Sequence, residues 1–99
     1  MKKVMVRYKV KPAHVAENES LIREVYKQLQ AERPPGFRYS TFKLSDGVSF
    51  VHLAIDEDDL NPLPKLEAFK NFQAALKDRC DELPLVDHVT EIGSFTGSS

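Results

Sequence analysis

The sequence predicts one α+β domain whose strands and helices follow the order βαββαβ. Apolar and polar residues alternate near the N-terminus and on both sides of an Asp-Gly pair, as in β-strands, and two longer segments repeat apolar residues at helical spacing. The 99 residues suffice for a single core, because a chain of this size buries roughly two-thirds of its surface. We expect residues 1–95 to form the domain and residues 96–99 a flexible tail.

The first strand is expected at residues 4–10 and the first helix at residues 14–33. Proline cannot continue a sheet ladder, so Pro12 ends the strand. The side of the strand that should be buried consists of Val4, Val6, Tyr8 and Val10. The apolar stripe of the helix consists of Val15, Ile22, Val25 and Leu29.

Residues 37–44 and 48–56 should form a hairpin around Asp46-Gly47, a favoured pair for a type I′ turn. That turn places Thr41 opposite His52 and Lys43 opposite Phe50. One face of the hairpin then carries Phe42, Leu44, Val51, Leu53 and Ile55. The other face carries Phe37, Tyr39, Thr41, Phe50, His52 and Ala54. We expect the helices to cover the first face and to leave the second open.

A second helix is expected at residues 65–81 and a last strand at about residues 85–95. The helical repeat consists of Leu66, Phe69, Phe72, Leu76 and Cys80, and Pro84 follows its end. Right-handed crossovers turn the βαββαβ order into a ferredoxin-like sandwich, with two helices on one face of a four-stranded antiparallel sheet.

The second face of the sheet would then be open, with Arg7 and Lys9 pointing from the first strand toward the same side. Monomers rarely expose an apolar patch of several hundred Å². A two-fold dimer buries such a patch on both copies. The sequence therefore predicts a homodimer that packs through the open sheet face.

Several short segments carry a resemblance to a known family. They are Pro35-Gly36-Phe37, the Asp46-Gly47 hairpin with Ser49-Phe50-Val51, Phe69-Lys70-Asn71-Phe72-Gln73, and Glu91-Ile92-Gly93-Ser94-Phe95. With the element order over nearly the whole chain, they resemble the dimeric α/β-barrel superfamily, in particular its antibiotic-biosynthesis-monooxygenase-like branch. The resemblance implies two sheets that form a barrel and a pocket between the sheet and the helices of each subunit. Members of the superfamily include small monooxygenases that act on aromatic or quinol compounds without metal or flavin. The resemblance therefore implies an activity of this kind, and no cofactor is expected.

The sequence departs from that family in one central respect. Catalytic members use Asn, Trp and either Tyr or His in the pocket, and this chain has no Trp. The haem-degrading branch places an iron-ligating His on the second helix, and residues 65–81 contain none. Haem oxygenase activity is therefore disfavoured, and a cofactor-independent oxygenase remains.

Three residues are candidates for catalysis: His52, Arg7 and Tyr39. An imidazole ordinarily titrates near neutrality, so His52 could remove a phenolic proton as a general base. The alternative is a His that is hydrogen-bonded in a dimer interface. Arg7 could bind a carboxylate or phenolate, or pair with an acid across the sheet. Tyr39 could stack on an aromatic ligand, or be an ordinary core or interface residue.

The expected ligand pocket adds Thr41, Phe50 and Asn71. Thr41 shares a hairpin face with His52, and Phe50 could stack on an aromatic ligand. Asn71 either faces the pocket or is a solvated helix residue. A non-catalytic dimer module, whose pocket binds a small ligand or is filled by its own side chains, remains the second hypothesis for the function.

Composition excludes several other classes of function. The 14 Lys and Arg residues nearly balance the 15 Asp and Glu residues, which argues against a nucleic-acid partner. No apolar run is long enough for a membrane span. A single cysteine, Cys80, excludes an internal disulfide and suits the cytoplasm, where we expect the protein to reside. The acidic residues 56–59 lack a calcium-loop pattern, so no metal site is expected.

Overall fold

The computed structural model describes residues 1–97, and Ser98 and Ser99 of the expected tail lie outside the described residues. The strands are β1 (Lys2–Val10), β2 (Phe37–Lys43), β3 (Ser49–Asp56) and β4 (Cys80–His88). The helices are α1 (Val15–Glu32), α2 (Glu67–Ala74) and the short α3 (Leu76–Arg79), with 3₁₀ turns η1 (Pro12–His14) and η2 (Leu63–Lys65). No helix in this part of the chain is long and apolar enough to cross a membrane.

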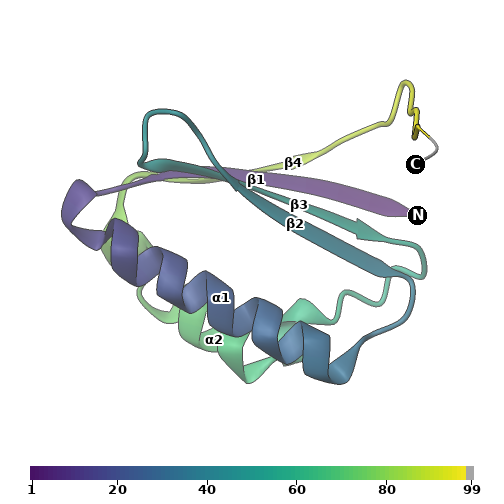
Figure 1. The fold of residues 1–99 in the computed structure, drawn as a ribbon, viewed down its shortest axis with the longest axis horizontal. Helices are drawn as coiled ribbons and strands as arrows, with labels where there is room; N and C mark the ends of the chain where they lie inside the picture. Colours follow the sequence, from purple (N-terminus) through teal and green to yellow (C-terminus); the bar gives the residue numbers. More distant parts are fainter. Residues whose placement is uncertain (98–99) are drawn as a thin grey trace.

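The strands form one antiparallel sheet in the order β2-β3-β1-β4, and the helices lie on one side of it (Figure 1). This confirms the predicted α+β, ferredoxin-like architecture. The core fills the space between the two layers. Its buried apolar residues are Tyr8, Val10, Ile22, Val25, Phe50, Leu63, Leu66, Phe72, Leu76 and Cys80.

The predicted hairpin register is confirmed, although the turn differs from the expected one. Thr41 pairs with His52, and Lys43 pairs with Phe50. Of the Asp46-Gly47 pair, only Gly47 has a positive φ, 77°, so the turn is not type I′. The Asp46 carboxylate instead accepts hydrogen bonds from the backbone N–H groups of Val48 and Ser49. This side chain closes a longer loop without changing the register.

The expected assignment of the two hairpin faces is wrong. Tyr8 pairs with Phe50, and Val6 pairs with His52, so Phe50 and His52 share the face of β1 that the helices cover. The hairpin face that carries Phe42, Val51 and Leu53 is the open one, and Phe42 itself is 54 % exposed. Directly opposite residues of antiparallel strands point to the same side, so the pairing with β1 decides which face of the hairpin is buried.

The second helix is shorter than expected, and the last strand begins earlier. Helical geometry breaks at Ala75 (φ −127°, ψ 25°). Cys80 already belongs to β4, and Pro84 lies inside this strand rather than before it. Edge strands tolerate proline where the pairing is irregular, and the β1–β4 register shifts at this point. Residues 89–97 are not in a strand.

Candidate functional site

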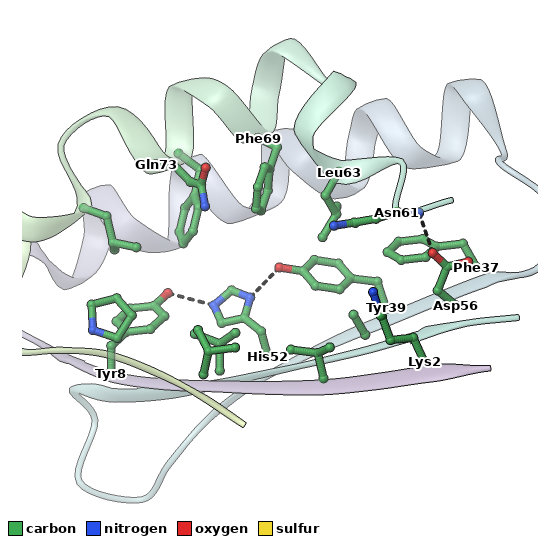
Figure 2. Close-up of a pocket in the computed structure, with 17 residues that line it drawn as sticks. Lys2, Tyr8, Phe37, Tyr39, His52, Asp56, Asn61, Leu63, Phe69 and Gln73 are labelled. Atoms are coloured by element: carbon green, nitrogen blue, oxygen red, sulfur yellow. Dashed lines mark hydrogen bonds between the residues drawn. The ribbon is translucent and has the colours of Figure 1, made fainter. Parts of the chain in front are cut away.

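A cavity of about 280 Å³ lies between the sheet and the helical layer (Figure 2). Its floor is formed from the covered face of the sheet by Val4, Val6, Tyr8, Tyr39, His52 and Ala54. Its roof is formed by Leu63, Phe69, Phe72, Gln73 and Leu76. Most of these side chains are apolar or aromatic, with a few polar groups among them. This is the usual composition of a small-molecule site.

His52 is the central polar group of the floor, and only 4 % of it is exposed. Its Nε2 lies 2.8 Å from the hydroxyl of Tyr8. Its Nδ1 lies 2.7 Å from the hydroxyl of Tyr39 and 3.1 Å from Oγ1 of Thr41. Burial lowers the pKa of His52 from 6.5 to about 4, because the charged ring would lose its hydration. The ring is therefore neutral at pH 7.

The two tyrosines that hold His52 are both protonated at neutral pH. Burial raises the pKa of Tyr8 and of Tyr39 above the ordinary value of 10. Tyr39 is further fixed by stacking against Phe37 and Tyr26, with ring centroids 5.9 and 5.4 Å away. Because the phenols keep their protons, they can donate hydrogen bonds to a ligand or to the imidazole.

Two buried polar side chains of the helical layer, Asn18 and Arg79, are linked to the Tyr8 hydroxyl. Nδ2 of Asn18 donates to the Tyr8 hydroxyl over 3.0 Å, and Nε of Arg79 donates to Oδ1 of Asn18 over 3.2 Å. Nη2 of Arg79 also donates to the backbone carbonyl of Phe72 over 2.7 Å. Asn18 is 0 % and Arg79 is 2 % exposed. The guanidinium also lies over the Phe72 ring, 5.4 Å from its centroid.

Sequence reasoning missed Asn18 and Arg79, although a signal was present. Asn18 lies at helical spacing between Val15 and Ile22, inside the apolar stripe of the first helix. Arg79 follows Leu76 by three residues in the same way. A polar residue on an apolar stripe is rarely buried unless it has a hydrogen-bond partner.

The predicted site residues are only partly brought together. His52, Tyr39 and Thr41 are in contact, as their shared hairpin face requires. Arg7 pairs with Val51 and is exposed on the open face, so the expectation that it shares a face with His52 is wrong.

None of the three expected pocket residues lines the cavity, although one of them, Thr41, contacts His52. Phe50 is 2 % exposed and packs in the core, where its ring stacks on Tyr8 at a centroid distance of 5.6 Å. Asn71 is exposed on α2, and Gln73 of the same helix lines the cavity in its place.

The other end of the cavity is formed by Lys2, Asp56 and Asn61 (Figure 2). The Asp56 carboxylate accepts hydrogen bonds from the backbone N–H groups of Asp58 and Asn61. It thereby holds the loop after β3 against this end. Within residues 1–97 there is no group of three or more side chains suited to hold a metal ion.

The fold resembles several solved structures over nearly its whole length. No protein-family model and no curated protein sequence matches the chain. An antibiotic biosynthesis monooxygenase is similar with a TM-score of 0.73 and 19% identity, over 94% of this chain and 100% of that chain. Rv0793 from Mycobacterium tuberculosis gives a TM-score of 0.76 and 16% identity, over 96% and 98%.

A third similar structure is a variant of SnoaB, a cofactor-independent oxygenase from Streptomyces nogalater. It gives a TM-score of 0.70 and 22% identity, over 97% of both chains. At these identities the likeness concerns the fold. The chain therefore has the α+β fold of antibiotic-biosynthesis-monooxygenase-like proteins, as its sequence segments led us to expect.

Proposed function

We propose that this protein binds a small aromatic or quinol compound in the cavity and oxidises it with O₂ without a metal or organic cofactor. The observation that carries the proposal is the cavity itself, with apolar walls and the Tyr39–His52 pair on its floor. An apolar cavity of about 150 Å³ already admits benzene. A volume of about 280 Å³ therefore suits a ligand of one or two rings.

Phe69 and Phe72 lie in the roof, where they can pack on the faces of an aromatic ligand. Tyr39 supplies a hydroxyl at the floor that can bind a ligand oxygen. A fixed donor at this place would stabilise negative charge that develops on that oxygen during oxidation. His52 acts through Tyr39, because both of its ring nitrogens already contact tyrosine hydroxyls.

A quinol suits a reaction without cofactor because it supplies its own electrons. One quinol and one O₂ convert into one hydroxyquinone and one water. One oxygen atom enters the ring, and the other is reduced to water by the two electrons that the quinol loses. SnoaB, which shares the fold, is described as a cofactor-independent oxygenase, and this likeness supports the same class of reaction here.

A thermal-shift screen with phenols, quinols and small aromatic acids tests the binding step. A ligand present at a hundred times its Kd should stabilise the fold by about 2.7 kcal/mol. Each compound that binds is then incubated with the protein and O₂, and oxygen uptake and product mass are measured. Absence of any stabilising compound would argue against the proposed site.

A second function, binding without catalysis, is favoured by two observations. The chain has no Trp, whereas catalytic members of the antibiotic-biosynthesis-monooxygenase-like branch use a Trp in the pocket. His52 also has no ring nitrogen free of a tyrosine contact. The two functions differ in one measurement: a binding module gives thermal shifts with no oxygen uptake above the rate of the ligand alone.

The proposed working form is a homodimer that packs through the open sheet face. The supporting observation is a group of apolar side chains on this face, which lie beside charged residues such as Arg7 and Arg38. The group consists of Phe42, Leu85, Val51, Leu53 and Ile55. Phe42 and Leu85 are 54 % and 73 % exposed in a single chain. Light scattering behind size-exclusion chromatography should therefore give twice the chain mass of 11.3 kDa at micromolar concentration, and a single-chain mass would refute the dimer.

A further inference from the structure

We propose that Arg79 and Asn18 are positioning residues that hold His52 in its Nδ1–H tautomer and so turn the Tyr39 hydroxyl into a hydrogen-bond donor toward the cavity. The chain of contacts runs from Arg79 through Asn18, Tyr8 and His52 to Tyr39. Every link is a side-chain contact between residues of this protein. The tautomer therefore follows from the structure whether or not the proposed oxidation takes place.

The first link fixes the orientation of the Asn18 amide. A guanidinium has only donors, so the atom of Asn18 that faces Nε of Arg79 must be the carbonyl oxygen Oδ1. The guanidinium cannot turn away freely, because Nη2 is bonded to the carbonyl of Phe72. A reversed amide would direct N–H groups at each other in a place that is closed to water. The NH₂ group of Asn18 therefore points to Tyr8.

The second link fixes the direction of the Tyr8 hydroxyl. This oxygen has two neighbours at hydrogen-bond distance within residues 1–97, Nδ2 of Asn18 and Nε2 of His52. Asn18 can only donate to it, so the phenolic proton goes to Nε2. If Nε2 carried a proton as well, the Tyr8 proton would have no acceptor among the side chains of residues 1–97. Tyr8 is 2 % exposed, and a buried donor without a partner destabilises the fold.

The third link, between His52 and Tyr39, determines where the proton of the Tyr39 hydroxyl points. Because Nε2 of His52 accepts, the single proton of the neutral ring is on Nδ1. Nδ1–H then donates to the hydroxyl of Tyr39 over 2.7 Å, with Thr41 as a second acceptor at 3.1 Å. The Thr41 hydroxyl is also paired with that of Tyr26, at 2.7 Å. The proton of Tyr39 is then not used by His52 and is available to an oxygen in the cavity that its ring lines, with the neighbouring Thr41 hydroxyl as its other acceptor (Figure 2).

A Tyr39 hydroxyl that donates toward the cavity favours some ligands over others, a consequence that rests on the proposed function. A ligand oxygen at Tyr39 must accept a hydrogen bond, so a carbonyl or a phenolate oxygen fits better than a group that only donates. With the opposite tautomer, Tyr39 would donate to Nδ1 and could only accept from the ligand. Arg79 and Asn18, which do not line the cavity, would thus set the polarity of its main hydrogen-bonding group.

Long-range ¹H–¹⁵N NMR of protein labelled at the histidine ring tests the inference without any ligand. The wild-type spectrum at pH 7 should show a protonated Nδ1 and an unprotonated Nε2 for His52. In Asn18→Asp the new carboxylate can only accept, so Tyr8 turns its proton to it and accepts from His52. The tautomer should then reverse to Nε2–H. Asn71→Asp adds the same charge on the exposed side of α2 and should leave the wild-type signals unchanged.

Two results would overturn the inference: an Nε2–H tautomer in the wild type, or an unchanged Nδ1–H tautomer in folded Asn18→Asp. If Asn18→Asp does not fold, Tyr8→Phe takes its place. This variant removes the donor to Nε2, so the Nδ1–H preference should be lost, and its persistence would also refute the chain. A different His52 tautomer would refute this inference but not the proposed oxidation. A failed ligand screen would argue against the proposed function but not against the tautomer.

Discussion

The Tyr8 hydroxyl lies 2.8 Å from Nε2 of His52, and the two rings stack with their centroids 5.3 Å apart. This contact joins the two central strands, β1 and β3, on the face that the helices cover. The polar centre of the cavity therefore lies on the two central strands of the sheet rather than on a loop. A site held in this way has little freedom to rearrange and is organised before a ligand binds.

Stability should fall when the pH is lowered from about 6.5 to about 4. Burial lowers the pKa of His52 from 6.5 to about 4, so between these pH values the imidazole is protonated in the unfolded chain but neutral in the folded chain. The stabilisation is fully present above pH 6.5 and is lost as the pH falls toward 4. Between pH 7 and 4.5 the difference is about 2 to 3 kcal/mol.

Urea unfolding of wild type and His52→Gln at several pH values checks this. Glutamine does not titrate, so the variant removes this component and keeps the contribution of the carboxyl groups. The wild-type free energy of unfolding should drop more steeply toward pH 4.5. Parallel curves for the two proteins would show that His52 does not titrate as its burial requires.

Tyr39→Phe should weaken ligand binding and leave the fold nearly intact. The change removes one hydroxyl and keeps the ring that stacks on Phe37 and Tyr26. The loss of stability should be about 1 kcal/mol, and the affinity for a bound quinol should fall about tenfold, as for one hydrogen bond. Calorimetric titration measures the affinity.

Tyr26→Phe is the matched control, because Tyr26 also bonds Thr41 but does not line the cavity. Its affinity for the same quinol should equal that of the wild type. An equal loss of affinity in Tyr39→Phe and Tyr26→Phe would indicate that both hydroxyls stabilise the fold and that neither binds the ligand directly.

Phe42→Glu should convert the proposed dimer into a monomer. Phe42 is more than half exposed on the open face, so a charge there costs a single chain little and opposes the packing of two apolar faces. Light scattering should report one chain mass instead of two. Gln30→Glu, on the exposed side of α1, adds the same charge and should leave the dimer unchanged. A dimer that survives Phe42→Glu would have to use another surface.

The fold was largely predictable from the sequence because its signals are local. Alternation gives the strands, helical spacing gives the helices, and Asp46-Gly47 sets the hairpin register, which the structure confirms. The bounds of β4 were not predictable in the same way. Pro84 is typical of a chain break, but it is accommodated in an edge strand where the pairing with β1 is irregular.

The site was predictable only within the hairpin. Thr41 and His52 face each other because of a local turn, so their contact was expected. Which hairpin face is buried depends on how β3 pairs with β1, which is distant in sequence (44 residues separate Tyr8 from His52). A shift of this pairing by one residue reverses every side chain. For this reason Arg7 was expected beside His52 but lies on the opposite face.

Substitution of Ala54 tests most directly whether the cavity over His52 binds the ligand. Ala54 lies on the cavity floor, so Ala54→Leu fills the space in which a ring would sit. Ala74→Leu, at the exposed end of α2, is the control. The measurement is calorimetric titration of both variants with the tightest-binding aromatic compound of the screen. We expect wild-type affinity for Ala74→Leu and no detectable binding for folded Ala54→Leu. Unchanged affinity in Ala54→Leu would show that the ligand binds elsewhere.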